Sequence, residues 1–284
     1  MEAVITCDYL DDAIDHYTTQ LGYRLDMIKP ADAPREALLS KDGEVPLRLV
    51  SEPPPSGGGP NITANWPPAH ADGSDWIVGR AGMEYRDLIP GRLGGKVIAS
   101  HIRLTTGGEV PDYVHYHKVD FQMIYCKFGR IKVVYEDQGP PFWLETGDCV
   151  LQPPEIRHRV LECTAGAEVI EVSMPAEHET WVEHDIKLPT AELKPDRDFG
   201  GQRFVRSIAA DAEWQPSEFH GFEARDSGIH AATSGLVNVQ LLRAMTADSA
   251  IVENAGDGFL IFPLDSSEIL AVRLSTAAKP HDVF

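Results

Sequence analysis

The chain has 284 residues, of which 43% are hydrophobic, and this length allows two or three domains with separate cores. Its 44 acidic and 25 basic residues give a formal charge of −19, which repels phosphate backbones and anionic lipids. No stretch reaches the ~20 consecutive apolar residues of a membrane span, and acidic residues stand where a secretory signal would be basic. We therefore expect a cytoplasmic protein without nucleic-acid or membrane partners.

Residues 1–50 predict a small module with the element order βαβββ. The apolar run 3–7 predicts a strand, and the acidic residues that follow suit the start of a helix. Ile14, Tyr17 and Leu21 recur at helical spacing until Gly22 ends the run. The segments 23–28, 36–40 and 46–50 then predict three strands, because prolines and a glycine separate them.

The helix of this module reads AIDHY at 13–17 and LGY at 21–23. With the element order, this resembles a half-module of the glyoxalase/vicinal oxygen chelate superfamily. That superfamily pairs its modules and places metal ligands on their strands, whereas the first strand here holds neither His nor Glu. We expect a structural or dimerising role for the module and no metal site in it.

The segment that follows the module is rich in proline and glycine. Residues 51–60 read SEPPPSGGGP, which offers too few backbone donors for regular structure. We therefore place a linker at 51–80.

From residue 82 onward the sequence repeats itself. The segment GMEYRD at 82–87 matches GFEARD at 221–226, and Arg103 matches Arg243. Farther along, the Gly-Asp pair at 147–148 matches the pair at 256–257, so the offset falls from 140 to 109 residues and the second copy lacks 31 residues. The missing piece corresponds to the histidine-rich part of the first copy. We predict one domain at 81–195 and a degenerate copy of it at 196–284.

A pair of histidines marks the first copy. Residues 113–117 read YVHYH, a strand-like run in which His115 and His117 share a face because side chains alternate along a strand. Further strands are predicted at 121–125, 130–135 and 149–152. Two prolines then end the last of these strands and deliver His158 onto the next one. Hairpins closed in this way can bring His158 opposite the histidine pair.

The spacing of these residues resembles the two motifs of the cupin superfamily. The first motif reads HxH, three or four residues, Glu, six residues, Gly; the corresponding residues here are His115, His117, Gln122 and Gly129. The second motif reads Gly, five residues, Pro, x, Gly, two residues, His; the corresponding residues here are Gly147, Pro153, Glu155 and His158. Two departures stand out, since Gln122 replaces the usual Glu and Glu155 replaces the second Gly.

The resemblance implies a mostly β fold: a cupin jelly-roll barrel and a degenerate second cupin-like barrel, preceded by the α+β module. It also implies one divalent metal ion on His115, His117, Gln122 and His158. Gln122 offers only a neutral amide oxygen, so the site would keep the full +2 charge and favour an anionic or enolisable substrate. Without Gln122, three imidazoles still suit Fe(II) or Zn(II). We favour Fe(II), with Zn(II), Mn(II) or Ni(II) as alternatives.

Other polar residues are candidates for roles around the metal. Side chains that could hold a substrate oxygen are Arg103, Tyr116, Lys127 and Arg157. The histidines expected to face solvent are His16, His70, His178, His184, His220, His230 and His281. For His101 we weigh a position at the mouth of the cavity against a core or paired role. The four cysteines form no CxxC pair and predict reduced, mostly buried thiols.

Three functions fit these patterns. The leading hypothesis is an Fe(II) dioxygenase that oxidises or cleaves a small enolisable or aromatic organic acid. The alternatives are a non-redox isomerase, lyase or polyketide cyclase with Zn, Mn or Ni, and a non-catalytic cupin that binds a small molecule. By analogy with cupin barrels, we expect a homodimer.

Overall fold

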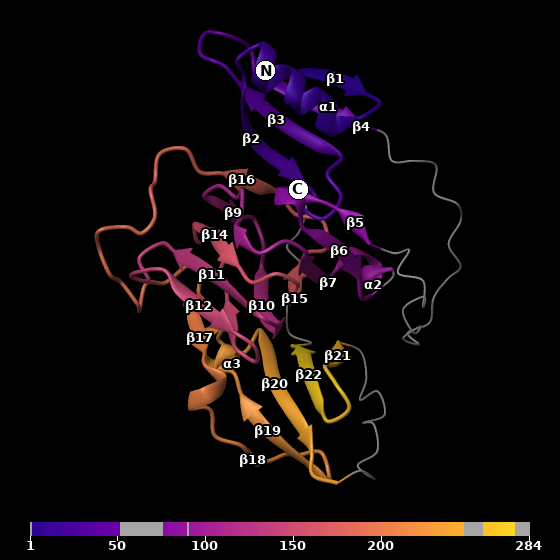
Figure 1. Ribbon diagram of the computed structural model, residues 1–284, viewed down its shortest axis with the longest axis vertical. Coiled ribbons are helices and arrows are strands. Elements are labelled where there is room, and N and C mark those ends of the chain that lie inside the picture. Colours follow the sequence, from indigo (N-terminus) through magenta and orange to yellow (C-terminus); the bar gives the residue numbers. More distant parts are fainter. Residues whose placement is uncertain (1, 52–75, 90, 247–257, 276–284) are drawn as a thin grey trace.

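The computed structural model describes residues 2–51, 76–89, 91–246 and 258–275. Strands are the main regular structure of these residues and form three sheets, with only short helical turns between them. Figure 1 shows the N-terminal strands at one end of the molecule, the histidine-bearing strands in the middle and the C-terminal strands at the other end. The predicted mostly β fold class is confirmed.

The N-terminal module has the predicted βαβββ order. Its elements are β1 (Ala3–Cys7), α1 (Leu10–Asp15), the π-helical turn η1 (His16–Gln20), β2 (Arg24–Lys29), β3 (Glu36–Ser40) and β4 (Leu47–Ser51). The strands lie in the order β1-β4-β3-β2, with β1 parallel to β4. Leu10 of α1 packs on Leu39 and Leu49 of the sheet. The relation to the glyoxalase superfamily stays a prediction.

The module is joined to the central strands by one continuous sheet. Strand β16 (Thr180–Val182) pairs with β2 on one side and with β9 (His115–His117) on the other. The sheet runs β1-β4-β3-β2-β16-β9-β14-β11-β12, and β8 pairs with β14. Its remaining strands are β8 (Gly108–Glu109), β11 (Arg130–Tyr135), β12 (Phe142–Glu145) and β14 (His158–Cys163).

A second sheet faces the central part of the first. It has the order β17-β13-β10-β15-β7-β6-β5. Its strands are β5 (Ile77–Val78), β6 (Glu84–Asp87), β7 (Ile98–Leu104), β10 (Phe121–Phe128), β13 (Cys149–Leu151), β15 (Ala167–Met174) and β17 (Val205–Ser207), with the turns η2 (Arg80–Gly82) and α2 (Arg92–Gly95). Ile102 and Ile124 of this sheet meet Val133 of the first sheet in one apolar cluster, so the space between the two sheets is a core.

The C-terminal residues form a third sheet of the order β18-β19-β20-β22-β21. Its elements are η3 (Ala209–Asp211), β18 (Gln215–Pro216), β19 (Phe222–Asp226), α3 (Ile229–Ala232), β20 (Val237–Ala244), β21 (Phe259–Pro263) and β22 (Glu268–Leu274). The sheet packs on the outer face of the second sheet, where Leu241 and Phe262 share a core with Phe121 and Met123. Phe121 and Tyr125 of β10 therefore point to this interface and not to the space between the first two sheets.

The sequence repeat has a structural counterpart. In both copies a strand, a short helical turn and a second strand follow one another, as β6-α2-β7 and as β19-α3-β20, and the two strands pair antiparallel. Arg103 pairs with Glu84 and lies 4.1 Å from the ring of Trp76. Equivalent contacts recur in the second copy, whose residues are Glu223, Arg243 and Trp214, with the guanidinium 4.3 Å from the ring. A bicupin origin of the two copies stays a prediction.

The predictions on the linker, on membrane spans and on the cysteines can be compared with the described residues. Most of the predicted linker, 52–75, lies outside them, but Ser51 belongs to β4, Ile77 and Val78 form β5, and Arg80 begins the turn η2. Within the described ranges, no helix is long and apolar enough to span a membrane. All four cysteines are free thiols, and all except Cys7 are buried, as predicted.

Candidate metal centre

Three of the predicted metal ligands meet in the core. His115 and His117 come from β9 and His158 begins β14, and one donor nitrogen of each lies within 4.8 Å of the other two. Their side chains are buried, with relative exposures of 0%, 4% and 6%. The ring centroids of His115 and His158 are 4.3 Å apart. These three residues are the histidines that the strand alternation and the motif spacing predict.

Strand register explains how the three rings converge. His115 and His117 alternate with the less buried Tyr116, and His115 is the register partner of His158 on the neighbouring strand. The turn before β14 is fixed by Glu155, which has a φ of 59° and whose N–H donates to the carbonyl of His117 at 3.1 Å. A left-handed φ is adopted most readily by glycine, which the cupin motif has at this position. The glutamate therefore keeps the turn geometry at a cost in backbone strain.

The hydrogen bonds of the rings determine which nitrogen can bind a metal. Nδ1 of His115 donates to the carbonyl of Tyr113 at 2.8 Å, and Nδ1 of His158 donates to the carbonyl of Ile156 at 2.9 Å. A carbonyl only accepts, so in both rings the proton is on Nδ1 and the lone pair is on Nε2. Nδ1 of His117 lies 2.8 Å from Oγ1 of Thr180. Such contacts orient metal-binding imidazoles.

A buried carboxylate supports the ring of His115 from behind. Oδ1 of Asp112 lies 3.7 Å from Nδ1 of His115 and also accepts the N–H of Tyr113 at 2.9 Å. Its Oδ2 accepts the N–H of Val160 on β14 at 2.9 Å. Asp112 thus ties the segment before β9 to the strand that carries His158.

Gln122 lies on the cavity side of β10. It alternates with Phe121 and Met123 and shares its face with Ile124, which lines the cavity between the sheets. Its side chain is 1% exposed, and its Nε2 has no hydrogen-bond partner among the described residues. Its role as a fourth metal ligand stays a prediction.

The histidines open onto a cavity of about 60 Å³. Its polar lining residues are Tyr85, His115, His117, Tyr135, Gln152, His158 and Glu171. Four of these, Tyr85, Tyr135, Gln152 and Glu171, were not predicted. Burial raises the pKa of Tyr135, and the charge of nearby Glu171 raises it further. Alternation along β15 gives no signal for Glu171, because residues on both faces of this strand, among them Val169 and Ile170, are buried.

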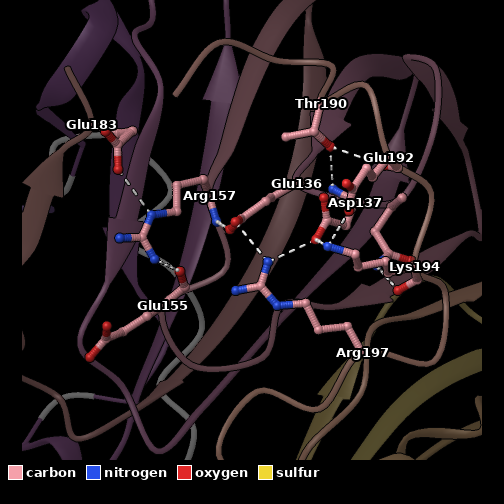
Figure 2. A network of polar contacts seen from close by, with 10 residues as sticks. Glu136, Asp137, Glu155, Arg157, Glu183, Thr190, Glu192, Lys194 and Arg197 are labelled. Carbon is pink, nitrogen blue, oxygen red and sulfur yellow. Dashed lines mark hydrogen bonds and ion pairs between the residues drawn. The ribbon is translucent and has the colours of Figure 1, made fainter. Parts of the chain in front are cut away.

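The four predicted candidates for a substrate contact lie elsewhere, and none of them is among the described residues that line the cavity. Arg103 pairs with Glu84, and Nζ of Lys127 lies 2.7 Å from Oε2 of Glu168. The guanidinium of Arg157 lies 4.2 Å from the ring centroid of Tyr116, and its Nε donates to Glu183 at 3.1 Å. Figure 2 shows the contact between Arg157 and Glu183 within a larger polar network.

Two further histidines differ in outcome. His101 is buried and paired, which is one of the two roles weighed for it: Arg86 donates to its Nδ1 at 3.0 Å, so Nε2 carries the proton that contacts Glu168 at 2.8 Å. The prediction that His178 faces solvent is wrong, since it is 5% exposed and its ring lies 5.4 Å from that of His117. It follows Pro175 in the turn between β15 and β16, and this turn folds behind β9. His70 and His281 lie outside the described residues.

Comparisons with known proteins give partial likenesses to solved structures. An RmlC-like cupin from Shewanella frigidimarina is 24% identical, and the match covers 38% of this chain and 89% of that protein, with a TM-score of 0.31. A variant of oxalate decarboxylase from Bacillus subtilis is 12% identical over 68% of this chain and 64% of that protein, with a TM-score of 0.40. KdgF from a Halomonas species is 19% identical over 37% of this chain and 91% of that protein, with a TM-score of 0.31. No family model and no curated protein matches the chain.

Proposed function

We propose that the chain is a cupin-type enzyme that holds one divalent metal ion on His115, His117 and His158 and acts on a small enolisable compound. The observation that carries this proposal is the convergence of three buried imidazoles within 4.8 Å. In His115 and His158 the proton is on Nδ1, which donates to a carbonyl, so the lone pair of Nε2 is available to a metal ion. Lone pairs brought together in a core repel one another, whereas a shared cation stabilises them. The residues therefore fit a metal ion.

The protein's part in the reaction is to bind and orient the substrate. A divalent ion at this position would polarise a substrate oxygen as a Lewis acid, and Fe(II) would in addition supply electrons to O₂. The surrounding side chains, among them Ile124 and Val133, keep the site in a small apolar enclosure. Such an enclosure excludes water and strengthens electrostatic contacts. We favour oxidation of the substrate with O₂ as the activity.

One observation favours a second candidate. Glu171 brings a carboxylate into the cavity that lies between the two sheets. A positioned carboxylate can move a proton, which is the chemistry of a non-redox isomerase, lyase or cyclase with Zn(II), Mn(II) or Ni(II).

Metal analysis tests the proposal. The purified protein is expected to bind one Fe(II) per chain, and His158→Ala is expected to lose that metal. His230→Ala is the matched control, because His230 is exposed and lies outside the cavity. Full metal content in His158→Ala would contradict the ligand set. Oxygen uptake with small enols then separates the candidates, since a protein that contains only Zn(II) and consumes no oxygen is not a dioxygenase.

A further inference from the structure

The polar lining of the cavity is only partly used by contacts inside the protein. Apart from the three histidines, its polar members are Tyr85, Tyr135, Gln152 and Glu171. Tyr85 and Glu171 take part in other interactions. The hydroxyl of Tyr135 and the side-chain amide of Gln152 form no hydrogen bond with a described residue. Of these two groups, strand register places Tyr135 beside the metal position.

Tyr135 belongs to the same row of residues as two of the proposed metal ligands. His115, His158 and Tyr135 are register partners across β9, β14 and β11. Register partners project from the same face of a sheet, and all three of these side chains line the cavity. The ring centroids of His158 and Tyr135 are 5.6 Å apart, with 27° between the ring planes. The phenol therefore extends alongside the imidazole into the same space.

The hydroxyl of Tyr135 opens into that space. Phe142 and Phe204 pack against its ring, with centroids 6.0 Å and 4.7 Å away, and neither offers a polar atom. The hydroxyl is not sealed among these apolar groups but is open to the cavity. The charge of Glu171, which lies on the opposite sheet, adds to burial in raising the pKa of Tyr135, so the hydroxyl points across the cavity. A phenol with a raised pKa keeps its proton and can donate it in a hydrogen bond.

The same row places this hydroxyl next to a bound ligand and not next to the ion. The three donor nitrogens come from β9 and β14 and lie within 4.8 Å of one another. Tyr135 is on β11, so His158 stands between it and His115. A phenol also reaches farther from its strand than an imidazole. A ligand that is held by the ion and fills the cavity therefore meets the phenol with an atom that the ion does not hold.

The rest of the cavity limits the ligand to a short compound. A volume of about 60 Å³ has room for roughly four to six water-sized groups. Most of its remaining lining is apolar, with side chains such as Ile124, Val133 and Val160. The carbon atoms of a ligand are expected to lie against these side chains.

We propose, on the basis of the function proposed above, that Tyr135 binds the substrate by donating its hydroxyl to an oxygen that the metal ion does not hold. The substrate class is a short oxygen chelator with a third oxygen, such as a 2-oxo or 2-hydroxy acid. Two of its oxygens bind the ion, and the third accepts the hydrogen bond of Tyr135. A ligand with a methyl group in place of the third oxygen leaves the hydroxyl without a partner, so Tyr135 selects against it.

Pyruvate and acetylacetone test this assignment on the Co(II)-loaded protein. Both chelate a metal through two oxygens, but pyruvate has a third oxygen where acetylacetone carries a methyl group. Titration followed by the visible absorption of Co(II) measures the affinity for each. We expect Tyr135→Phe to bind pyruvate about tenfold more weakly than the wild type, and acetylacetone at least as tightly.

The stability of the metal-free protein gives a second measurement. Tyr135→Phe removes a hydroxyl that has no partner among the described residues, so thermal unfolding of the metal-free variant is expected at the wild-type temperature or above it. A less stable variant, or one that does not fold or does not bind Co(II), would show that the hydroxyl serves the protein's own structure and would overturn the inference. Tyr125→Phe is the matched control, because it removes a buried hydroxyl that faces the third sheet. It is expected to bind both compounds as the wild type does.

The outcomes distinguish this inference from the proposed function. If Tyr135→Phe weakens both compounds equally, or leaves pyruvate unchanged, Tyr135 does not select for the third oxygen. If the Co(II)-loaded wild type binds neither compound, the proposed substrate class is wrong. These results overturn the inference and leave the metal site intact. A wild type that binds no Co(II) contradicts the proposed function itself, and the inference falls with it.

Discussion

Thr180 is the residue that fixes the ring of His117, and it comes from a different element than the histidines. Its hydroxyl lies 2.8 Å from Nδ1 of His117, and its side chain is fully buried. Replacement by valine keeps the shape but removes the hydrogen bond. We predict that Thr180→Val lowers metal affinity by about 10- to 100-fold, because partners behind a ligand orient it and raise its basicity.

Competition with a chromophoric chelator measures this change. Thr180→Ser keeps the hydroxyl and is expected to retain most of the affinity. Equal affinity in the valine variant and the wild type would mean that Thr180 does not orient His117. The thermal midpoint of each variant shows whether the core has been disturbed.

At the residue scale, the sequence predicts the three histidines well, because each is fixed by a local rule. Strand alternation puts His115 and His117 on one face, and the motif spacing places His158 after a turn. The cationic candidates could not be placed in the same way. Arg103 and Lys127 are held by Glu84 and Glu168, and these partners are 19 and 41 residues away along the chain. Which face such a residue takes depends on the pairing of distant strands.

At the scale of elements, a polar network fixes the connection between β16 and β17. Arg197 donates to Glu136 at 2.7 Å and to Asp137 at 2.9 Å, at the turn between β11 and β12 (Figure 2). Thr190 accepts the N–H of Asp137 at 2.8 Å, and the N–H of Lys194 donates to the Asp137 carbonyl at 2.8 Å. The connection is thus attached to the first sheet through one buried turn.

Removal of Arg197 tests this attachment. Arg197→Ala leaves two buried carboxylates without their main partner, and we expect a loss of about 1 kcal/mol, since Arg197 itself is partly exposed. Arg197→Lys keeps the charge but not the forked geometry and should lose less. Urea unfolding measures both variants. No difference between wild type and Arg197→Ala at pH 7 would show that the network adds nothing to stability.

The same network should respond to acid. Burial alone would raise the pKa of Asp137, but hydrogen bonds from Arg197 and Thr190 outweigh it and lower the pKa below its ordinary value of 3.8. A lowered pKa in the folded state means that the contribution is complete above about pH 4 and is lost as the pH falls below it. The difference between Arg197→Ala and the wild type is therefore expected to shrink below that pH.

Most elements of the central region could be predicted, but their pairing across the molecule could not. The strands at 121–125, 130–135 and 149–152 follow from apolar runs between glycine and proline turns, and β10, β11 and β13 confirm them. Strand β16 has only three residues and shows no apolar alternation. Its importance comes from its two neighbours, β2 and β9, and a single segment of sequence holds no information on such distant partners.

At the scale of the whole molecule, the third sheet and the second sheet share one hydrophobic core. Leu241, with a relative exposure of 2%, packs in the same cluster as Phe121 and Met123 of β10. We predict that Leu241→Ala destabilises the protein by about 2–5 kcal/mol, because it leaves a cavity in this core. We also predict that metal release and unfolding of the third sheet occur in one transition.

Denaturation of Co(II)-loaded protein, followed by visible absorption and by tryptophan fluorescence, measures both effects. Met245→Ala is the control, because Met245 is 56% exposed and its truncation opens no cavity. Two separate transitions would show that the third sheet unfolds independently of the metal centre.

The homodimer expected from the sequence stays a prediction.

Strand β9 lies between β16 and β14, so it links the N-terminal half of the long sheet to its other half. β9 is three residues long, and its ladder with β14 has the single register pair His115 and His158, whereas β16 pairs with all three of its residues. The sheet is thus weakest, in backbone hydrogen bonds, at the line where the histidines lie. An ion bound across that line, as in the proposed function, would add bonds between the two strands and so strengthen the link between the N-terminal module and the rest of the long sheet.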